Sequence, residues 1–236
     1  MNNFIIPLQQ AEGLVENFQV NIPKEDPVVQ FGGIIDVESL PYIKNPPLIY
    51  KGFMAWFGLN QRDELVLFFE DDVYYDPNNL PTKPSKSSLL ESDRIINKGY
   101  LGTSPNRRIQ DLSVPSMVLG RKDKFTPNSQ VISAINRFKN LFPLDSNRKP
   151  FNNYPFGFFE NNTIVDFSIF LNQPNLKHIA YFFGYNDLNP EYIATNRIRI
   201  VLAGLSDKGV LLPSYNEANM EDRVLLQYSW PPPPNS

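Results

Sequence analysis

The chain has 236 residues, of which 42% are hydrophobic and 13% aromatic, so it is too apolar for a typical disordered protein and long enough for one large domain or two small ones. Its 22 basic and 25 acidic residues give a net charge of −3, which provides no strong field to attract nucleic acid or an anionic membrane. Because cysteine is absent, disulfides, thiolate nucleophiles and cysteine-ligated zinc are excluded.

The first residues, 1–18, lack the basic start and the apolar run of a signal peptide, and no stretch approaches the roughly 18 apolar residues of a membrane span. We therefore expect a cytoplasmic protein that does not use a membrane as its partner. The 22 prolines gather in connections between periodic segments, which predicts long ordered loops.

An amphipathic helix is the first predicted element, at residues 7–18, where apolar residues recur every three or four positions. Residues 127–138 repeat this pattern. Pro7 and Phe18 fall opposite Pro127 and Phe138 at one common shift, since 127 − 7 and 138 − 18 both give 120. The proline in each segment suits a first helical turn.

A glycine-containing segment follows each helix. Phe31-Gly32-Gly33 matches Phe156-Gly157-Phe158, and the acids Asp36 and Asp166 come next in similar surroundings. An acidic side chain at the start of a helix accepts hydrogen bonds from unpaired N–H groups, so we expect a short helix after each acid.

The closest match is between KGFMAWFG at residues 51–58 and KHIAYFFG at residues 177–184, which predicts two buried strands that end at glycine turns. Strand-forming runs follow and end at Asp72 and Asp207. A fourth block then aligns residues 93–96 with residues 222–225.

The matched segments occur in the same order in both halves, so we predict an α+β fold made by tandem duplication of one unit of helix, short helix and antiparallel strands. The two units would occupy residues 1–104 and 125–236, joined by a connecting segment at 105–124, and would pack with pseudo-twofold symmetry around a natural ligand cleft. The alternative is that similar amphipathic elements recur by chance, as they do in many α+β proteins.

A family resemblance rests on two of these motifs. The aromatic strand that ends in Phe-Gly, together with the helix segment ISAINRF from Ile132 to Phe138, resembles uncharacterised Bacteroidota proteins of unknown function. The resemblance implies no particular activity.

An acidic strand end is the main candidate for metal binding. Glu70, Asp71 and Asp72 close a predicted strand, with Asp207 at the corresponding place in the second half, and carboxylates in such positions hold hard cations such as Mg²⁺ or Ca²⁺. The alternative is that these residues are solvated turn residues. No cofactor is expected apart from a possible divalent cation.

No catalytic residue is predicted. His178 is the only histidine and begins a predicted buried strand, and the segment around Ser206 lacks the Gly-x-Ser-x-Gly spacing of a serine nucleophile. A structural or surface role for His178 is the expectation.

The tail SWPPPPNS is the one short segment with a binding chemistry of its own. Consecutive prolines favour an extended left-handed helix that aromatic grooves bind, which makes Trp230, Pro231 and Pro232 candidate binding residues. The alternative is a tail that stops the last element, with Trp230 packed on the domain.

These features favour a non-enzymatic binding or assembly protein, whose partner is a protein or a second copy of the chain more readily than nucleic acid. The rival hypothesis is a metal-assisted hydrolase or phosphotransferase that uses Glu70, Asp71 and Asp72. A third is self-assembly through exposed strand edges.

Overall fold

The computed structural model describes residues 5–21, 31–44, 52–73, 76, 79–92, 94–101, 109–141, 154–160, 170–185, 197–212 and 225–228. These residues form helices, two antiparallel sheets and the loops that connect them, which confirms the predicted α+β class. No helix among them is long and apolar enough to cross a membrane.

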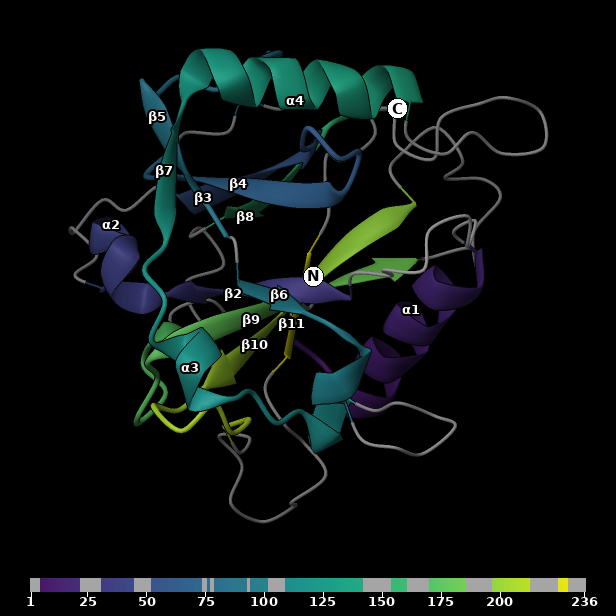
Figure 1. Cartoon of the computed structure of the whole chain (residues 1–236), viewed down its shortest axis with the longest axis vertical. Coiled ribbons are helices and arrows are strands. Elements are labelled where there is room, and N and C mark those ends of the chain that lie inside the picture. The colour runs from purple at the N-terminus through teal and green to yellow at the C-terminus, as the bar shows by residue number, and fades with distance from the viewer. Residues whose placement is uncertain are drawn as a thin grey trace.

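Sheet A has six strands in the order β1-β11-β10-β9-β2-β6, and sheet B has five in the order β7-β5-β4-β3-β8 (Figure 1). The strands of sheet A are, in that order, Ile5–Ile6, Leu225–Tyr228, Ile198–Leu205, His178–Tyr185, Gly32–Asp36 and Arg94–Ile96. Those of sheet B are Lys124–Pro127, Ser88–Glu91, Leu65–Asp71, Gly52–Leu59 and Phe156–Glu160.

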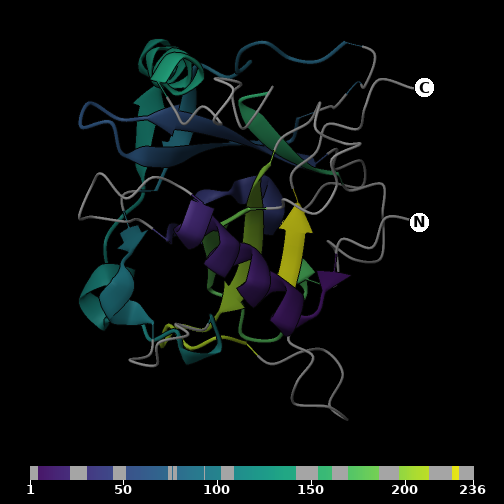
Figure 2. The same ribbon diagram turned by 90° about the vertical axis from the view of Figure 1, so that its right-hand side faces the viewer.

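Two long helices cover the sheets, α1 (Leu8–Asn21) and α4 (Asn128–Leu141). Figure 1 shows α4 on the side of sheet B that faces away from sheet A, and Figure 2 shows α1 lying across the strands of sheet A. The short helices are η1 (Val37–Ser39), α2 (Pro41–Lys44), η2 (Lys98–Tyr100), η3 (Ile109–Asp111) and α3 (Ser116–Leu119).

Both long helices were predicted from their apolar periodicity, and both predictions are confirmed. The apolar positions at spacings of three and four form one stripe on each helix, and that stripe is buried against the sheet. In α4 the buried residues are Val131, Ala134, Ile135 and Phe138.

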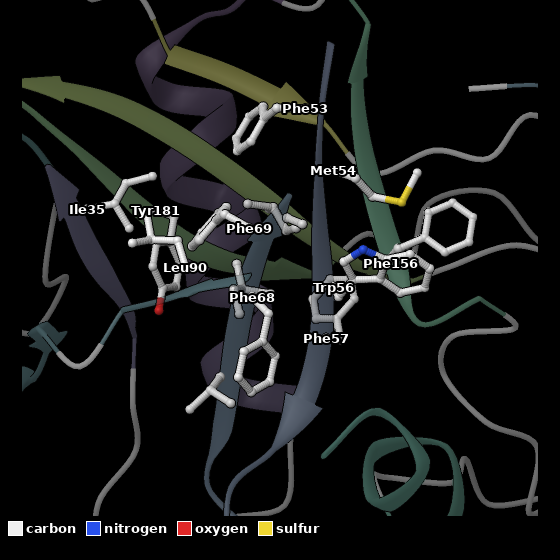
Figure 3. Close-up of a cluster of buried hydrophobic side chains, with 14 of the residues drawn as sticks. Ile35, Phe53, Met54, Trp56, Phe57, Phe68, Phe69, Leu90, Phe156 and Tyr181 are labelled. Atoms are coloured by element: carbon white, nitrogen blue, oxygen red, sulfur yellow. The ribbon is translucent and has the colours of Figure 1, made fainter. Parts of the chain in front are cut away.

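The predicted buried strands are β3 and β9, and all eight residues of each are buried. Aromatic side chains fill the space between the sheets. Phe69 of sheet B lies 5.4 Å from Tyr181 of sheet A and 5.7 Å from Phe53 between ring centroids (Figure 3). Each buried aromatic ring removes about 150–250 Å² from water, so this cluster is a main source of stability.

Gly58 and Gly184 do not end their strands at turns, so that prediction is wrong. β3 continues to Leu59 and β9 to Tyr185. Each glycine instead lets a helix approach the sheet. A Cβ at Gly58 would lie 3.0 Å from Cβ of Ala134 in α4, and one at Gly184 would lie 3.0 Å from Cβ of Leu14 in α1.

The segment after the first helix was only partly predicted. Asp36 caps η1 by accepting a 3.0 Å hydrogen bond from the backbone N–H of Glu38, as expected for an acid at a helix start. The glycine-containing segments were not expected to form strands, but they form β2 and β8, because their short apolar runs pair with β9 and β3. Asp166 lies outside the described residues.

Of the two segments aligned as a fourth block, the structure describes residues 94–96 and residue 225. β6, which contains residues 94–96, pairs with β2, whereas β11 pairs with β10 and β1. The strand next to β4 is β5. Short apolar runs such as these carry too little pattern to fix their partners.

Each sheet combines strands from both predicted units. β2, from the first unit, pairs with β9, from the second, and β8, from the second, pairs with β3, from the first. The edge strands β1 and β7 follow the same rule, since β1 pairs with β11 and β7 pairs with β5, whereas the edge strand β6 pairs with β2 of its own unit. The two sheets are therefore not the products of two separate stretches of chain.

Candidate functional site

Glu70, the first residue of the predicted acidic cluster, is 1% exposed in the middle of sheet B. Its Oε1 accepts hydrogen bonds from the backbone N–H groups of Ser85 (2.7 Å) and Lys86 (2.8 Å) and from the Ser85 hydroxyl, and its Oε2 accepts one from Trp56 Nε1 at 3.0 Å. These donors satisfy a buried charge and fix the loop at residues 84–86 on the sheet.

Asp71 is the next residue in the same strand, so its side chain points to the opposite face of the sheet from that of Glu70. It accepts 3.0 Å hydrogen bonds from the backbone N–H groups of Tyr42 and Asp72. Asp72 has a φ of 54° just past the strand, and Asp207 follows β10 in the other sheet. Within the described parts of the chain, no three His, Cys, Asp or Glu side chains group as a metal site would require.

The predicted tail residues Trp230, Pro231 and Pro232 lie outside the described residues. Their binding role stays a prediction.

A pocket of about 680 Å³ lies beside α4, and we call it the α4 pocket. One side of the pocket is formed by the β3–β4 turn and the outer face of β4, and the other side by α4 and β7. The pocket lies next to the end of β5 at Glu91. Its lining includes Asn60, Gln61, Arg62, Glu64, Val66, Phe68, Glu91, Ser92, Ile95, Lys124, Thr126, Ser129, Gln130, Ser133, Ala134 and Arg137.

The floor of the α4 pocket is apolar and its walls are polar. Val66 and Phe68 of β4 and Ala134 of α4 are buried. Ser129 and Ser133 of α4 are exposed at the wall. Known small-molecule sites have about 300–1,000 Å³, so this pocket has a suitable size, and its lining is more polar than that of most such sites.

Arg137 is held in this pocket by two hydrogen bonds to one backbone oxygen. Its Nε and Nη2 donate hydrogen bonds of 3.0 Å and 2.7 Å to the carbonyl oxygen of Leu59. Both bonds use one edge of the planar guanidinium. The Nη1–Nη2 edge makes no hydrogen bond or ion pair with any residue that the structure describes.

The two pocket carboxylates already have partners inside the protein. Glu64 Oε2 accepts a 2.6 Å hydrogen bond from Asn60 Nδ2. Glu91 Oε2 accepts a hydrogen bond from Thr126 and lies 3.3 Å from Lys124 Nζ. The charges of Glu91 and Lys124 therefore offset each other.

A buried group of charges, the Arg94 cluster, lies at the ends of β2 and β9 and consists of Arg94, Asp123, His178 and Asp36. Arg94 Nη2 lies 2.8 Å from Asp123 Oδ1, and the two side chains are 1% and 0% exposed. Arg94 Nη1 donates a 3.2 Å hydrogen bond to the carbonyl oxygen of Leu119 and lies 3.5 Å from His178 Nδ1. Asp123 Oδ2 also accepts a 2.8 Å hydrogen bond from the backbone N–H of Asp36.

Burial shifts both titratable groups of this cluster toward their neutral forms. Burial lowers the pKa of His178 from its ordinary value of 6.5, more strongly than nearby Asp36 raises it. Burial likewise raises the pKa of Asp123, although the hydrogen bond from Asp36 and the charge of Arg94 act in the opposite direction.

The Arg94 cluster adjoins the α4 pocket along the chain. Arg94 precedes Ile95, and Asp123 precedes Lys124, and both Ile95 and Lys124 line the pocket. The ion pair therefore ties together two segments that both line the pocket. His178 begins a buried strand, as predicted, but its contact with a buried arginine was not expected.

Sequence reasoning did not identify the pocket residues. Gln130, Ser133 and Arg137 lie on one side of α4 at spacings of three and four, and this pattern is the same as that of any solvated helix face. Arg137 is part of the ISAINRF motif at residues 132–138, yet nothing in the motif distinguishes an arginine at a pocket from one in solvent.

No family model, curated protein or solved structure matches this chain. The resemblance to Bacteroidota proteins stays a prediction.

Proposed function

We propose that the protein is a non-enzymatic binding protein formed by tandem duplication, and that its ligand occupies the α4 pocket. The observation that carries the proposal is the position of the pocket. Its walls come from residues 60–95 and from residues 124–137, so residues of both predicted units line it. Ligand sites often lie where separate parts of a protein meet.

The order of strand neighbours supports the duplication. Sheet A contains the series β1-β11-β10-β9-β2, and sheet B contains the series β7-β5-β4-β3-β8. Under the duplication, each strand of the first series corresponds to the strand at the same place in the second. Ile5 pairs with Leu226, and Phe125 pairs with Leu90. Ile5 and Phe125 differ by 120 residues, the shift that aligns the two long helices (125 − 5 = 120).

Under this proposal the two units exchange their N-terminal segments. α1 and β2 pack on strands of the second unit, while α4 and β8 pack on strands of the first. The aromatic contacts follow the same exchange: Phe18 stacks on Phe183 and Phe138 on Phe57, each with centroids 5.4 Å apart. Phe57 and Phe183 then meet at 6.5 Å, as equivalent residues near a pseudo-twofold axis would.

The metal-assisted hydrolase gains no support from Glu70 or Asp71. Both accept backbone hydrogen bonds that bind loops to the sheet, and their side chains lie on opposite faces. We therefore favour the binding protein.

The proposal predicts that filling the α4 pocket abolishes ligand binding. Ser133 is exposed on the pocket wall, so Ser133→Trp should fill the pocket without disturbing the buried face of α4. Ligand-observed NMR with a library of small molecules of mixed charge should give hits on the wild type that Ser133→Trp loses.

Asn136→Trp is the matched control, because Asn136 is exposed on the same helix but does not line the pocket. This variant should keep the hits. If Ser133→Trp keeps every hit that the wild type gives, or if the wild type gives none, the α4 pocket is not a ligand site.

A further inference from the structure

We infer that the α4 pocket takes a small organic carboxylate whose anionic group pairs with the guanidinium of Arg137. This inference rests on the proposed binding function and adds the chemical class of the ligand.

The charges of the pocket favour an anion. Arg62, Lys124 and Arg137 supply three positive charges, and Glu64 and Glu91 supply two negative ones. Glu91 is paired with Lys124 and Glu64 accepts a hydrogen bond from the neutral amide of Asn60, so one positive charge is left over. A carboxylate would balance it, whereas a cation would add to the excess.

The geometry of Arg137 favours a planar anion. Its two hydrogen bonds to the Leu59 carbonyl hold the guanidinium in one orientation before any ligand arrives. The Nη1–Nη2 edge then presents two parallel N–H groups, which match the two oxygens of a carboxylate. Because the side chain is already ordered, binding costs less conformational entropy than it would at a mobile surface arginine.

The rest of the pocket limits the body of the ligand. Behind the polar wall the floor is made by Val66, Phe68 and Ala134, which suits a short apolar group. The hydroxyls of Ser129 and Ser133 lie on the α4 wall. Ser133 Oγ donates a 3.0 Å hydrogen bond to the Ser129 carbonyl, and its oxygen keeps lone pairs that suit a ligand N–H or O–H donor.

The test compares probes of similar size whose polar groups differ in charge. Benzoate, benzamide and benzylammonium, together with butyrate and butyramide, are titrated into the full-length protein at low salt by ligand-observed NMR. Each carboxylate should bind at least fivefold more tightly than its amide, and benzylammonium should bind more weakly than benzamide.

Variants assign the preference to one side chain. Arg137→Gln should reduce the carboxylate preference to about twofold or less and leave amide affinity unchanged, a result that a general loss of folding would not give. Arg137→Lys should keep part of the preference. Arg121→Gln removes an exposed charge outside the pocket and should change nothing.

The outcomes separate this inference from the proposed function. If amides and carboxylates bind equally and Ser133→Trp blocks both, the inference of an anion is wrong and the binding function stands. If inorganic phosphate binds more tightly than every carboxylate, the assignment to carboxylates is overturned. If no probe of any charge binds and the mixed library also gives no hits, both proposals fall.

Discussion

His178 is the only histidine of the chain, and it is held beside Arg94 in a buried cluster. Because burial lowers its pKa below 6.5, the unfolded chain binds a proton at this side chain more readily than the folded protein does. The contribution of His178 to the free energy of unfolding therefore decreases as the pH falls through about 6.5 toward the lowered value, with a slope of at most about 1.4 kcal/mol per pH unit.

We expect His178→Gln to lose this part of the pH dependence, since glutamine fills a similar space and does not titrate. Urea unfolding at pH 7.5, 6.5 and 5.5 should give a steeper loss of stability for the wild type than for the variant. Asp123 has a raised pKa, which gives the opposite slope at lower pH, but it is present in both proteins and its effect largely cancels in the comparison. Parallel curves would mean that His178 keeps its ordinary pKa.

Glu70 illustrates why residue identity alone did not reveal a role. An acidic triplet after an apolar strand suggested a cation site, because exposed carboxylates at strand ends often serve that purpose. The direction of each side chain depends on strand register, which alternates faces from one residue to the next. In sheet B this alternation directs Glu70 toward Trp56 and the loop at Ser85 and directs Asp71 toward Tyr42.

At the scale of elements, Gly58 sets the distance between α4 and sheet B. A Cβ at this position would lie 2.6 Å from Phe68 Cε2 and 3.0 Å from Ala134 Cβ, so even alanine forces the helix or the ring to move. We expect Gly58→Ala to lower the free energy of unfolding by about 1–3 kcal/mol, as overpacked cores do. The same substitution should weaken ligand binding, because Phe68 and Ala134 are part of the α4 pocket.

Gly13 provides the control for this prediction. It lies within α1, and an added Cβ would meet nothing within 4 Å. Gly13→Ala should therefore raise the free energy of unfolding by about 0.5–1 kcal/mol through helix propensity alone. Chemical denaturation of both variants measures the two effects. A neutral Gly58→Ala would show that α4 does not pack closely against β3.

The elements themselves were largely predictable, because their patterns are local. The apolar periodicity of α1 and α4 and the aromatic runs of β3 and β9 reflect which face each segment buries, and the sequence records that directly. β2 and β8 were missed, since five-residue strands that contain glycine resemble loops until a partner strand is present. The α4 pocket was missed for a related reason: its walls come from segments distant in the chain.

At the scale of the whole molecule, order along the chain accounts for only part of the strand pairing: β3 pairs with β4 and β9 with β10, but the pairings between the two halves do not follow it. Consecutive elements usually pack together. Here β2 is followed in sequence by β3, yet it pairs with β9, and β8 pairs with β3. Apolar strands of similar composition offer little to distinguish one partner from another, so local pattern leaves the exchange undetermined.

The exchange makes a prediction about a chain that is cut between residues 104 and 105, where the connecting segment begins. Fragment 1–104 supplies α1 and β2, which pack on strands of the other fragment, and fragment 105–236 supplies α4 and β8, which pack on strands of the first. Fragment 1–104 keeps β6 beside β2 but lacks β9, on which α1 and β2 pack, and fragment 105–236 lacks β3, on which α4 and β8 pack. We therefore expect the co-expressed fragments to purify as a 1:1 complex that melts cooperatively.

Separately expressed fragments should each lack the native fold, because β3 and β9 would each lose a neighbouring strand and a covering helix. This loss would expose aromatic residues such as Phe57 and Phe183 to water. Light scattering and amide hydrogen exchange measure assembly and protection. Two fragments that fold alone as monomers with protected β3 and β9 amides would indicate independent domains.

A 1:1 complex that regains the carboxylate preference of the intact chain would indicate that the α4 pocket forms where the two segments meet, since its walls are divided between the fragments.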